Sequence, residues 1–281
     1  MSGVSNSKIA IVTGASSGIG KAISERLVKM GYEVFGIGRN FEQVSADHGV
    51  NCVSDSVNLV GECGITGDAG ADSHDEICCG EDIGTESCVY GCFHPIVCDL
   101  RETGKLLEIV RNIMKETDGQ LSLLVNNAGV AYYGLHEELN PEKISEMVRV
   151  NLEVPMILTQ KLLRALKENK GNVINISSVT AISSNPHGVA YGATKAGLMS
   201  FSRSLFDEAR KYGVGVTAIL PDMTDTALYR NADFGTDEQP DAHLEPEDVA
   251  DAVEYALSVR EGTCVPEIVL RPQLHRIKRK K

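Results

Sequence analysis

A tyrosine and a lysine four residues apart are the side chains best suited to chemistry in this chain. Tyr191 and Lys195 stand at the start of a predicted helix, 190–212, so both project from one face about one turn apart. A tyrosine has a pKa near 10, too high for acid–base work at neutral pH, and a neighbouring ammonium lowers it by stabilising the phenolate. Such pairs also occur by chance on surfaces, so this pair needs support from other residues.

A glycine-rich turn forms a second candidate site. Residues 8–13 are a short apolar, β-branched run that predicts a strand, and the stretch that begins at Ile19 has helical spacing. Between them stand Thr13, Gly14, Gly18 and Gly20. Glycine lets the backbone approach a pyrophosphate closely, and the helix N-terminus offers unpaired N–H groups and partial positive charge. Because glycine turns are common, the prediction of a dinucleotide site depends on this placement between strand and helix.

This glycine spacing resembles that of the classical short-chain dehydrogenase/reductase family. The resemblance covers nearly all of the chain except an insertion and the last dozen residues, and it includes Asp99 and the run Asn126-Asn127-Ala128-Gly129. It implies that Asp99 contacts the adenine ring and that the asparagine run steadies the central sheet and lines the adenine ribose. The cofactor contacts we expect are Gly14, Ser16, Ser17, Gly18, Ile19, Gly20, Arg39, Asp99, Leu100, Asn127, Ala128, Gly129, Tyr191, Lys195, Pro221, Thr224 and Thr226.

The residues after the second predicted strand indicate which dinucleotide is bound. An acid there would hydrogen-bond a free ribose 2′-hydroxyl, whereas an arginine attracts a 2′-phosphate. This chain has Gly38-Arg39-Asn40 and no acid at the strand tip. We therefore predict NADP(H) rather than NAD(H), with a merely solvated surface arginine as the alternative.

The resemblance also implies a catalytic tetrad of Asn151, Ser178, Tyr191 and Lys195. Ser178 lies thirteen residues before Tyr191, at the end of a predicted strand. In the family's pattern Tyr191 exchanges the proton with the substrate oxygen, which Ser178 hydrogen-bonds, while Lys195 contacts the nicotinamide ribose and Asn151 holds a water behind it. Ser177 is the alternative for the serine role.

The substrate is expected near the tetrad. Asp222 follows Pro221 where the family usually has glycine, which leaves the path of that loop open, and Thr224 and Thr226 are expected beside the nicotinamide carboxamide. The apolar share of the candidates predicts a partly hydrophobic ketone or alcohol, with a small ketone, an acyl thioester and a steroid all open. The candidates are Ala131, Tyr132, Ser184, His187, Met223, Leu228 and Phe234.

Alternating strands and helices must position these residues. We expect an α/β fold: one Rossmann-type, doubly wound parallel sheet with helices on both faces, within a single domain of residues 1–281. The predicted strands are 8–13, 33–38, 95–98, 121–126, 172–177, 214–220 and 267–270. The predicted helices are one ending at Gly31, then 102–117, 141–169, 190–212 and 246–259.

An irregular insertion, 47–94, separates the second and third strands. Eleven acids and no lysine or arginine lie between Phe41 and His94, which accounts for nearly all of the net charge of -12. We expect a solvated acidic loop, with a structural zinc or a thiol switch as alternatives, and we assign no metal ligands. The candidate zinc ligands are Cys52, Cys63, Cys78, Cys79, Cys88, Cys92, His74 and His94.

Composition narrows the class of protein. The chain has no broad basic face for nucleic acid, no apolar run of membrane-spanning length and no signal-peptide pattern, so we expect a cytoplasmic protein with a small carbonyl or alcohol substrate. A homo-oligomer, dimer or tetramer, is expected from the family resemblance. The basic tail, 271–281, is expected to be solvated and disordered. These features together predict an NADP(H)-dependent oxidoreductase. The alternative is a non-catalytic NADP(H)-binding sensor or regulatory protein, and the complete tetrad favours the enzyme.

Overall fold

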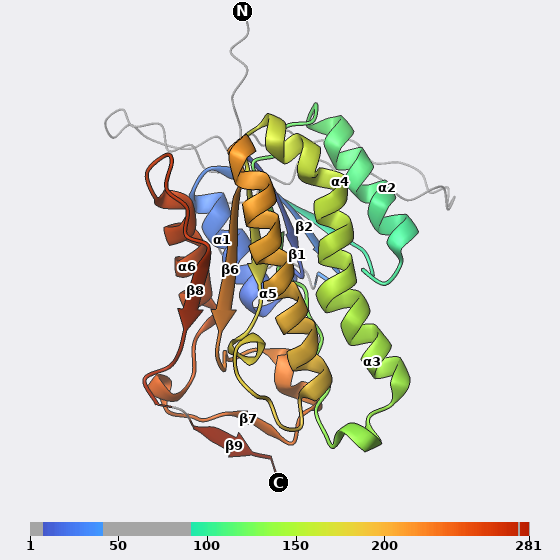
Figure 1. Ribbon diagram of the computed structural model, residues 1–281, viewed down its shortest axis with the longest axis vertical. Coiled ribbons are helices and arrows are strands. Elements are labelled where there is room, and N and C mark those ends of the chain that lie inside the picture. Colours follow the sequence, from blue (N-terminus) through green and yellow to red (C-terminus); the bar gives the residue numbers. More distant parts are fainter. Residues whose placement is uncertain (1–7, 42–90, 275, 281) are drawn as a thin grey trace, which may run out of the picture.

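The computed structural model describes residues 8–41, 91–274 and 276–280. Within them a seven-stranded parallel sheet occupies the centre, in the order β3-β2-β1-β4-β5-β6-β8 (Figure 1). Its strands are β1 (Lys8–Thr13), β2 (Tyr32–Gly38), β3 (Phe93–Val97), β4 (Leu123–Asn126), β5 (Asn172–Ile176), β6 (Gly215–Pro221) and β8 (Glu267–Leu270). The strand order reverses between β1 and β4, and ligands of such sheets bind at the carboxyl ends of the strands beside this reversal.

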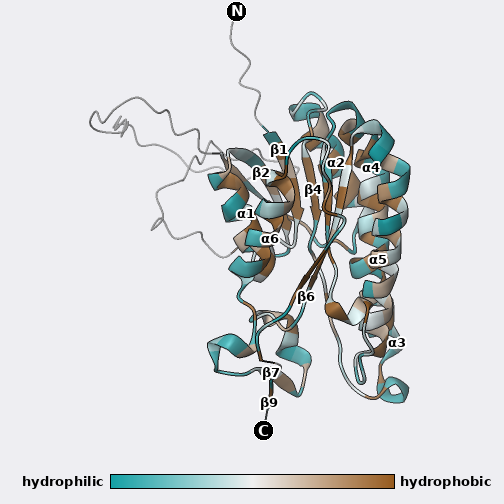
Figure 2. Ribbon diagram, turned by 60° about the vertical axis from the view of Figure 1, so that its left-hand side comes forward, coloured by the Kyte–Doolittle hydropathy of each residue, from teal (hydrophilic) through white to brown (hydrophobic). Residues whose placement is uncertain are grey.

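Helices cover both faces of the sheet, as predicted. One face packs against α1 (Gly18–Lys29) and α6 (Pro246–Ser258), and the other against α2 (Thr103–Glu116), α4 (Val154–Glu168) and α5 (Val189–Ala209). Successive residues of β1 enter opposite cores, since Ile9 and Ile11 belong to one apolar cluster and Ala10 and Val12 to the other. Figure 2 shows the resulting apolar strands between the helix layers. The predicted doubly wound fold is confirmed.

The helix predicted over 141–169 is interrupted. It consists of α3 (Pro141–Val148), a π-helical turn (Arg149–Glu153) and α4. Pro155 has no backbone N–H to bond the carbonyl of Asn151, so a regular helix cannot continue there. Single π turns of this kind are rare, and those that occur are frequently found at functional sites. This one carries Asn151.

The third strand begins within the range predicted for the insertion. β3 runs over Phe93–Val97 rather than 95–98. His94, a candidate zinc ligand, instead stacks on Phe35 with ring centroids 4.7 Å apart, and its Nε2 lies 3.0 Å from Glu33 Oε1. Cys92 directly precedes the strand. The other candidate zinc ligands, Cys52, Cys63, His74, Cys78, Cys79 and Cys88, lie outside the described residues, so the nature of the insertion stays a prediction.

The basic tail is partly ordered, which corrects the expectation of a disordered terminus. Ile277–Arg279 form β9, which pairs antiparallel with β7 (Phe234–Thr236) at the lower end of the molecule in Figure 1. Tail lysines lie beside acids of this region, and Lys278 Nζ forms an ion pair with Glu238. Charge complementarity and backbone pairing together explain the order. Among the described residues, no helix combines the length and apolar character that crossing a membrane requires.

Candidate active site

The glycine turn follows β1, and hydrogen bonds connect Thr13, at the end of that strand, to the segment after β4. Gly14 and Gly18 have φ of +69° and +52°, backbone conformations that glycine adopts without strain. A Cβ on Gly20 would lie 2.1 Å from the carbonyl oxygen of Gly14. Thr13 Oγ1 accepts hydrogen bonds of 3.1 Å from the backbone N–H groups of Asn127 and Ala128. The turn is therefore closed to side chains and leaves the N-terminus of α1 facing the pocket.

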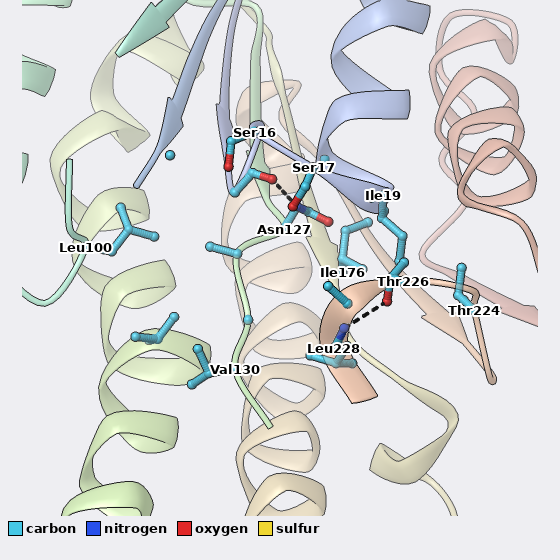
Figure 3. A pocket seen from close by; sticks show the side chains of 18 of the residues that line it. Ser16, Ser17, Ile19, Leu100, Asn127, Val130, Ile176, Thr224, Thr226 and Leu228 are labelled. Carbon is cyan, nitrogen blue, oxygen red and sulfur yellow. Dashed lines mark hydrogen bonds between the residues drawn. The ribbon is translucent and has the colours of Figure 1, made fainter. Parts of the chain in front are cut away.

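A single pocket brings the predicted cofactor contacts together. It lies between Ile19 at the start of α1, Leu100 after β3, and Thr226 and Leu228 (Figure 3). All the residues predicted to contact the cofactor line it, as do Ser177 and Ser178. The glycine cradle and the exposed N–H groups of α1 suit a dinucleotide pyrophosphate, so the residues present fit a nicotinamide dinucleotide.

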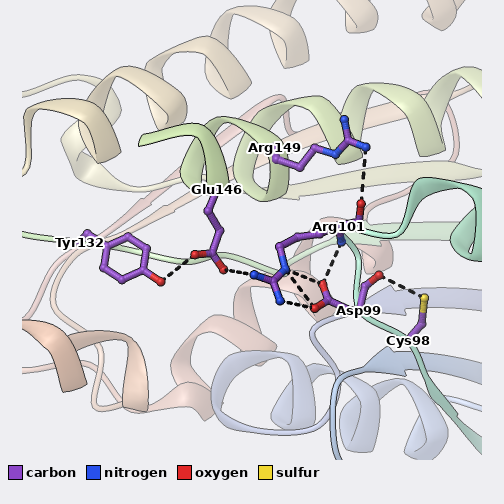
Figure 4. A network of polar contacts seen from close by, with 6 residues as sticks. All are labelled: Cys98, Asp99, Arg101, Tyr132, Glu146 and Arg149. Carbon is purple, nitrogen blue, oxygen red and sulfur yellow. Dashed lines mark hydrogen bonds and ion pairs between the residues drawn. The ribbon is translucent and has the colours of Figure 1, made fainter. Parts of the chain in front are cut away.

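One end of the pocket carries charge of both signs. Arg39 is exposed at the end of β2, and Asp99 follows β3. Arg101 donates to both carboxylate oxygens of Asp99, with Nε 3.0 Å from each, and its Nη1 lies 3.5 Å from Glu146 Oε1 (Figure 4). These bonds, with a smaller contribution from the charge of Arg39, lower the pKa of Asp99. Sequence reasoning missed Arg101, although its position two residues after Asp99 was a usable signal.

The other end of the pocket holds the tyrosine and the lysine. Tyr191 and Lys195 lie on α5 and each is 4% exposed. Lys195 Nζ donates to the carbonyl of Ile176 at 2.8 Å and lies 5.8 Å from the centroid of the Tyr191 ring. Burial lowers the pKa of Lys195 to about 8 and raises that of Tyr191 to about 12, against a hydrogen bond from Ser178 that lowers it.

The pKa of Tyr191 is therefore raised on balance, whereas the neighbouring ammonium led us to expect a lowered pKa. The lysine is itself buried, and the loss of water around the phenol outweighs any attraction by the ammonium. Tyr191 remains a phenol at neutral pH. In that state it is a proton donor.

The two adjacent serines have different environments. Ser177 follows β5 and its hydroxyl donates to the backbone carbonyl of Lys195 at 3.0 Å, which fixes it as a structural contact to α5. Ser178 accepts a hydrogen bond from the backbone N–H of Thr180 at 3.2 Å and hydrogen-bonds the Tyr191 phenol. Of the two, the geometry favours Ser178 for the role beside the reacting oxygen.

Asn151 lies behind the pocket and is not among its lining residues. It is fully buried; its Oδ1 accepts from the backbone N–H of Val130 and its Nδ2 donates to the carbonyl of Val130, both at 2.8 Å. Its Nδ2 also lies 3.1 Å from Thr194 Oγ1, which donates to the carbonyl of Tyr191. The π turn thus connects the segment after β4 to the first turns of α5.

The predicted substrate residues are only partly brought together. Leu228 lines the pocket, Ala131 and Met223 are buried, and Ser184 and His187 are exposed. Tyr132 is not a lining residue; its hydroxyl donates to Glu146 Oε2 at 2.8 Å, as Figure 4 shows. Its neighbour Tyr133 does not line the pocket either, so the lining does not choose between the two tyrosines.

The aromatic group beside Tyr191 comprises Tyr133, Tyr229 and Phe234. Tyr133 has its ring centroid 6.0 Å from that of Tyr191 and packs edge-on against Phe234, with centroids 4.9 Å apart. Burial raises the pKa of both Tyr133 and Tyr229. Of these three, Phe234 was predicted, and Tyr133 and Tyr229 were not.

The loop after β6 has a defined path despite the aspartate. The backbone N–H of Met223 donates to Asp222 Oδ1 at 2.9 Å, and Thr224 Oγ1 donates to the Asp222 carbonyl at 3.0 Å. The segment 223–225 then runs beside Leu244 through backbone hydrogen bonds. Thr224 and Thr226 both reach the pocket.

Known proteins with similar sequences and folds are oxidoreductases. An uncharacterized oxidoreductase of Staphylococcus aureus (strain USA300) is 30% identical over 267 residues, 94% of this chain and 97% of the relative. An alcohol dehydrogenase of the archaeon Thermococcus sibiricus, solved with 5-hydroxy-NADP, has a TM-score of 0.71 at 23% identity, covering 96% of this chain and 98% of its own.

A 3-ketoacyl-(acyl-carrier-protein) reductase of Brucella melitensis, solved with NADH, has a TM-score of 0.69 at 20% identity, covering 95% of this chain and 97% of its own. The sequence model described as short chain dehydrogenase matches residues 8–55 and 80–235. This protein belongs to the short-chain dehydrogenase family of oxidoreductases.

Proposed function

We propose that the protein is an NADP(H)-dependent oxidoreductase that interconverts a ketone or aldehyde and an alcohol, with Tyr191 as the proton donor and acceptor. The observation that carries this proposal is the buried Tyr191 phenol, hydrogen-bonded by Ser178, in the same pocket as the glycine cradle. A protein that only binds a dinucleotide needs the glycine cradle but no proton donor beside it. The phenol and the hydroxyl beside it suit proton transfer to a carbonyl oxygen.

The chain's own residues would act as follows in the direction of reduction. A bound dinucleotide supplies the hydride. Ser178 and Tyr191 hydrogen-bond the carbonyl oxygen, and Tyr191 gives its proton as negative charge develops there. A phenol with its pKa raised to about 12 remains protonated at neutral pH, and an alkoxide is a stronger base than a phenolate, so the transfer is downhill. Lys195, with its pKa near 8, stabilises the phenolate that remains.

The preference for NADP(H) rests on charge at the end of β2. Arg39 is exposed there, lines the pocket, and has no ion pair within the described ranges. Its guanidinium is free to bind a 2′-phosphate in two hydrogen bonds. The similar structures include one solved with an NADP derivative and one solved with NADH, so the fold does not distinguish between the two cofactors. The preference for NADP(H) therefore rests on Arg39.

The test is NADPH oxidation against a panel of ketones, aldehydes and diketones, with wild type and Tyr191→Phe. We expect the variant to lose about 10³-fold in kcat, the scale of a lost general acid, and to keep its NADPH affinity. Tyr255→Phe is the matched control, because Tyr255 is 59% exposed on α6. Near-normal turnover by Tyr191→Phe would contradict the mechanism. Tight NADPH binding without turnover of any carbonyl would favour a cofactor-binding regulator.

A further inference from the structure

The C-terminal segment 276–280 lies beside β7, which follows the last pocket-lining residues, Tyr229 and Arg230. Its strand β9 pairs with β7 in the register Phe234↔Arg279, Gly235↔Lys278 and Thr236↔Ile277. The match to the family's sequence model ends at residue 235. Strand β9 therefore lies outside the residues that this model matches.

Contacts from the tail reach both ends of the segment 229–241. Lys280 donates through its backbone N–H to the carbonyl of Asp233 at 2.7 Å and through its Nζ to the carbonyl of Tyr229 at 2.6 Å. Further along, Arg276 Nη1 lies 2.8 Å from Gln239 Oε1, and the backbone N–H of Leu274 donates to the backbone carbonyl of Asp241 at 2.8 Å. The tail thus holds this segment at several separate points.

The held segment carries two of the three aromatic residues beside Tyr191. Phe234, on β7, packs against Tyr133 at 4.9 Å and against Tyr229 at 5.7 Å between ring centroids. Tyr229 lines the pocket. Its backbone carbonyl accepts a hydrogen bond from Lys280 Nζ, and its phenol accepts one from the backbone of Thr224. Phe234 contacts Tyr133, and Tyr133 contacts Tyr191, so two rings link the strand paired with the tail to Tyr191.

The pairing of β7 with β9 and the packing of Phe234 depend on each other energetically. An isolated pair of short strands is marginal at best in water, and β7 and β9 have three residues each. Exposed ion pairs such as Lys278 with Glu238 contribute little to stability, because water screens them. The pairing therefore needs the packing of Phe234, and the position of Phe234 in turn depends on the pairing.

We propose that β9 is a positioning strand that holds Tyr133, Tyr229 and Phe234 as an aromatic wall and so determines which carbonyl substrates fit beside Tyr191. The inference rests on the proposed reductase activity for its substrate part. The preferred substrates carry a flat or branched apolar group next to the carbonyl, because the ring of Tyr229 lines the pocket and the rings of Tyr133 and Phe234 pack against it. Loss of the strand loosens the wall without disturbing the glycine cradle at the far end of the pocket.

The test compares the full chain with a truncation ending at Leu274 and with Lys280→Ala. Arg279→Ala is the matched control, since it removes one cation from the same strand and, in the described part of the chain, the Arg279 side chain has neither ion pair nor hydrogen bond. Two readouts are used: amide hydrogen exchange over 226–242, and kcat and KM for a bulky aryl ketone and a small aliphatic ketone.

We expect faster exchange over 226–242 in the truncation, and a KM for the aryl ketone raised about tenfold, equivalent to about 1.4 kcal/mol of lost binding. The kcat, the KM for the small ketone and the NADPH affinity stay close to wild type. Lys280→Ala shows a smaller change in the same direction, and Arg279→Ala shows none.

Unchanged exchange, or faster exchange with the same preference between the two ketones, would overturn the inference. So would a parallel loss of NADPH affinity and of far-UV circular dichroism in Lys280→Ala, since the tail would then support the whole fold. If wild type reduces no carbonyl, the proposed function fails, and the exchange experiment still decides whether β9 holds the segment.

Discussion

Replacing Lys195 by methionine is expected to stabilise the protein while abolishing its activity. The ammonium is buried, and the loss of hydration lowers its pKa from 10.5 to about 8. In the unfolded chain the same lysine is fully hydrated. Below about pH 8 the folded state therefore bears the free-energy cost of a buried charge, and methionine keeps a similar apolar stem without that charge.

The size of the effect follows from the two pKa values. At about 1.36 kcal/mol per pKa unit, the difference between 10.5 and about 8 corresponds to roughly 3 kcal/mol of destabilisation near neutral pH. The variant also leaves the carbonyl of Ile176 without its 2.8 Å donor, which costs about 1–2 kcal/mol at every pH. We expect Lys195→Met to raise the free energy of unfolding by about 1–2 kcal/mol at about pH 7.

The sign of the pH dependence is also determined. Between about pH 8 and pH 10.5 the unfolded wild-type chain binds more protons at Lys195 than the folded chain does, so the lysine's contribution to the free energy of unfolding rises with pH. The advantage of the variant should therefore shrink by about 2–3 kcal/mol from about pH 7 to about pH 10. Other titrating groups are common to both proteins and cancel in the difference.

The assay is urea unfolding of the cofactor-free proteins, followed by far-UV circular dichroism because the chain has no tryptophan. Lys161→Met, at an exposed position of α4, is the control for exchanging a lysine for a methionine. If the difference between wild type and Lys195→Met does not change with pH, the ammonium is not desolvated as the structure indicates, and the reasoning is refuted.

Three further variants test other parts of the site. Arg39→Ala should raise the KM for NADPH about tenfold and leave that for NADH unchanged, because only NADPH carries the 2′-phosphate; equal effects on both would exclude a phosphate contact. Gly20→Ala places a Cβ 2.1 Å from the Gly14 carbonyl oxygen. It should lower the free energy of unfolding by about 1–3 kcal/mol and weaken dinucleotide binding. The control is Gly104→Ala, which should be tolerated because the space around Gly104 is open. Asn151→Ala leaves the N–H and carbonyl of Val130 without their buried partner and should lower the free energy of unfolding by about 2–3 kcal/mol; a change below about 0.5 kcal/mol would show that the contact is not needed.

Local sequence determined the layout of the sheet and the cradle. Apolar β-branched runs alternate with helical spacing along the chain, and short crossovers leave few ways to arrange such a series except as a parallel sheet with helices on both faces. The glycine turn was equally readable, because its backbone conformations exclude side chains within a few residues of sequence. Tyr191 and Lys195 could be paired because one helix carries both.

Contacts between distant segments were decided by the tertiary structure. The family resemblance already favoured Ser178 over Ser177, but only the tertiary structure shows that the Ser177 hydroxyl donates to the Lys195 carbonyl. The packing of Tyr133 against Phe234 joins two residues that are about a hundred positions apart in the sequence.

The order of the tail and the raised pKa of Tyr191 both come from side chains that folding brings to them from distant parts of the sequence. The tail's charges predicted solvation, whereas folding places opposite the tail both Glu238, which pairs with Lys278, and the packed ring of Phe234. A sequence shows which groups can ionise, whereas the amount of water removed from each is set by the side chains that the whole fold packs around it. That burial sets the pKa of the tyrosine and of the lysine one turn away, and so the protonation state of each at neutral pH.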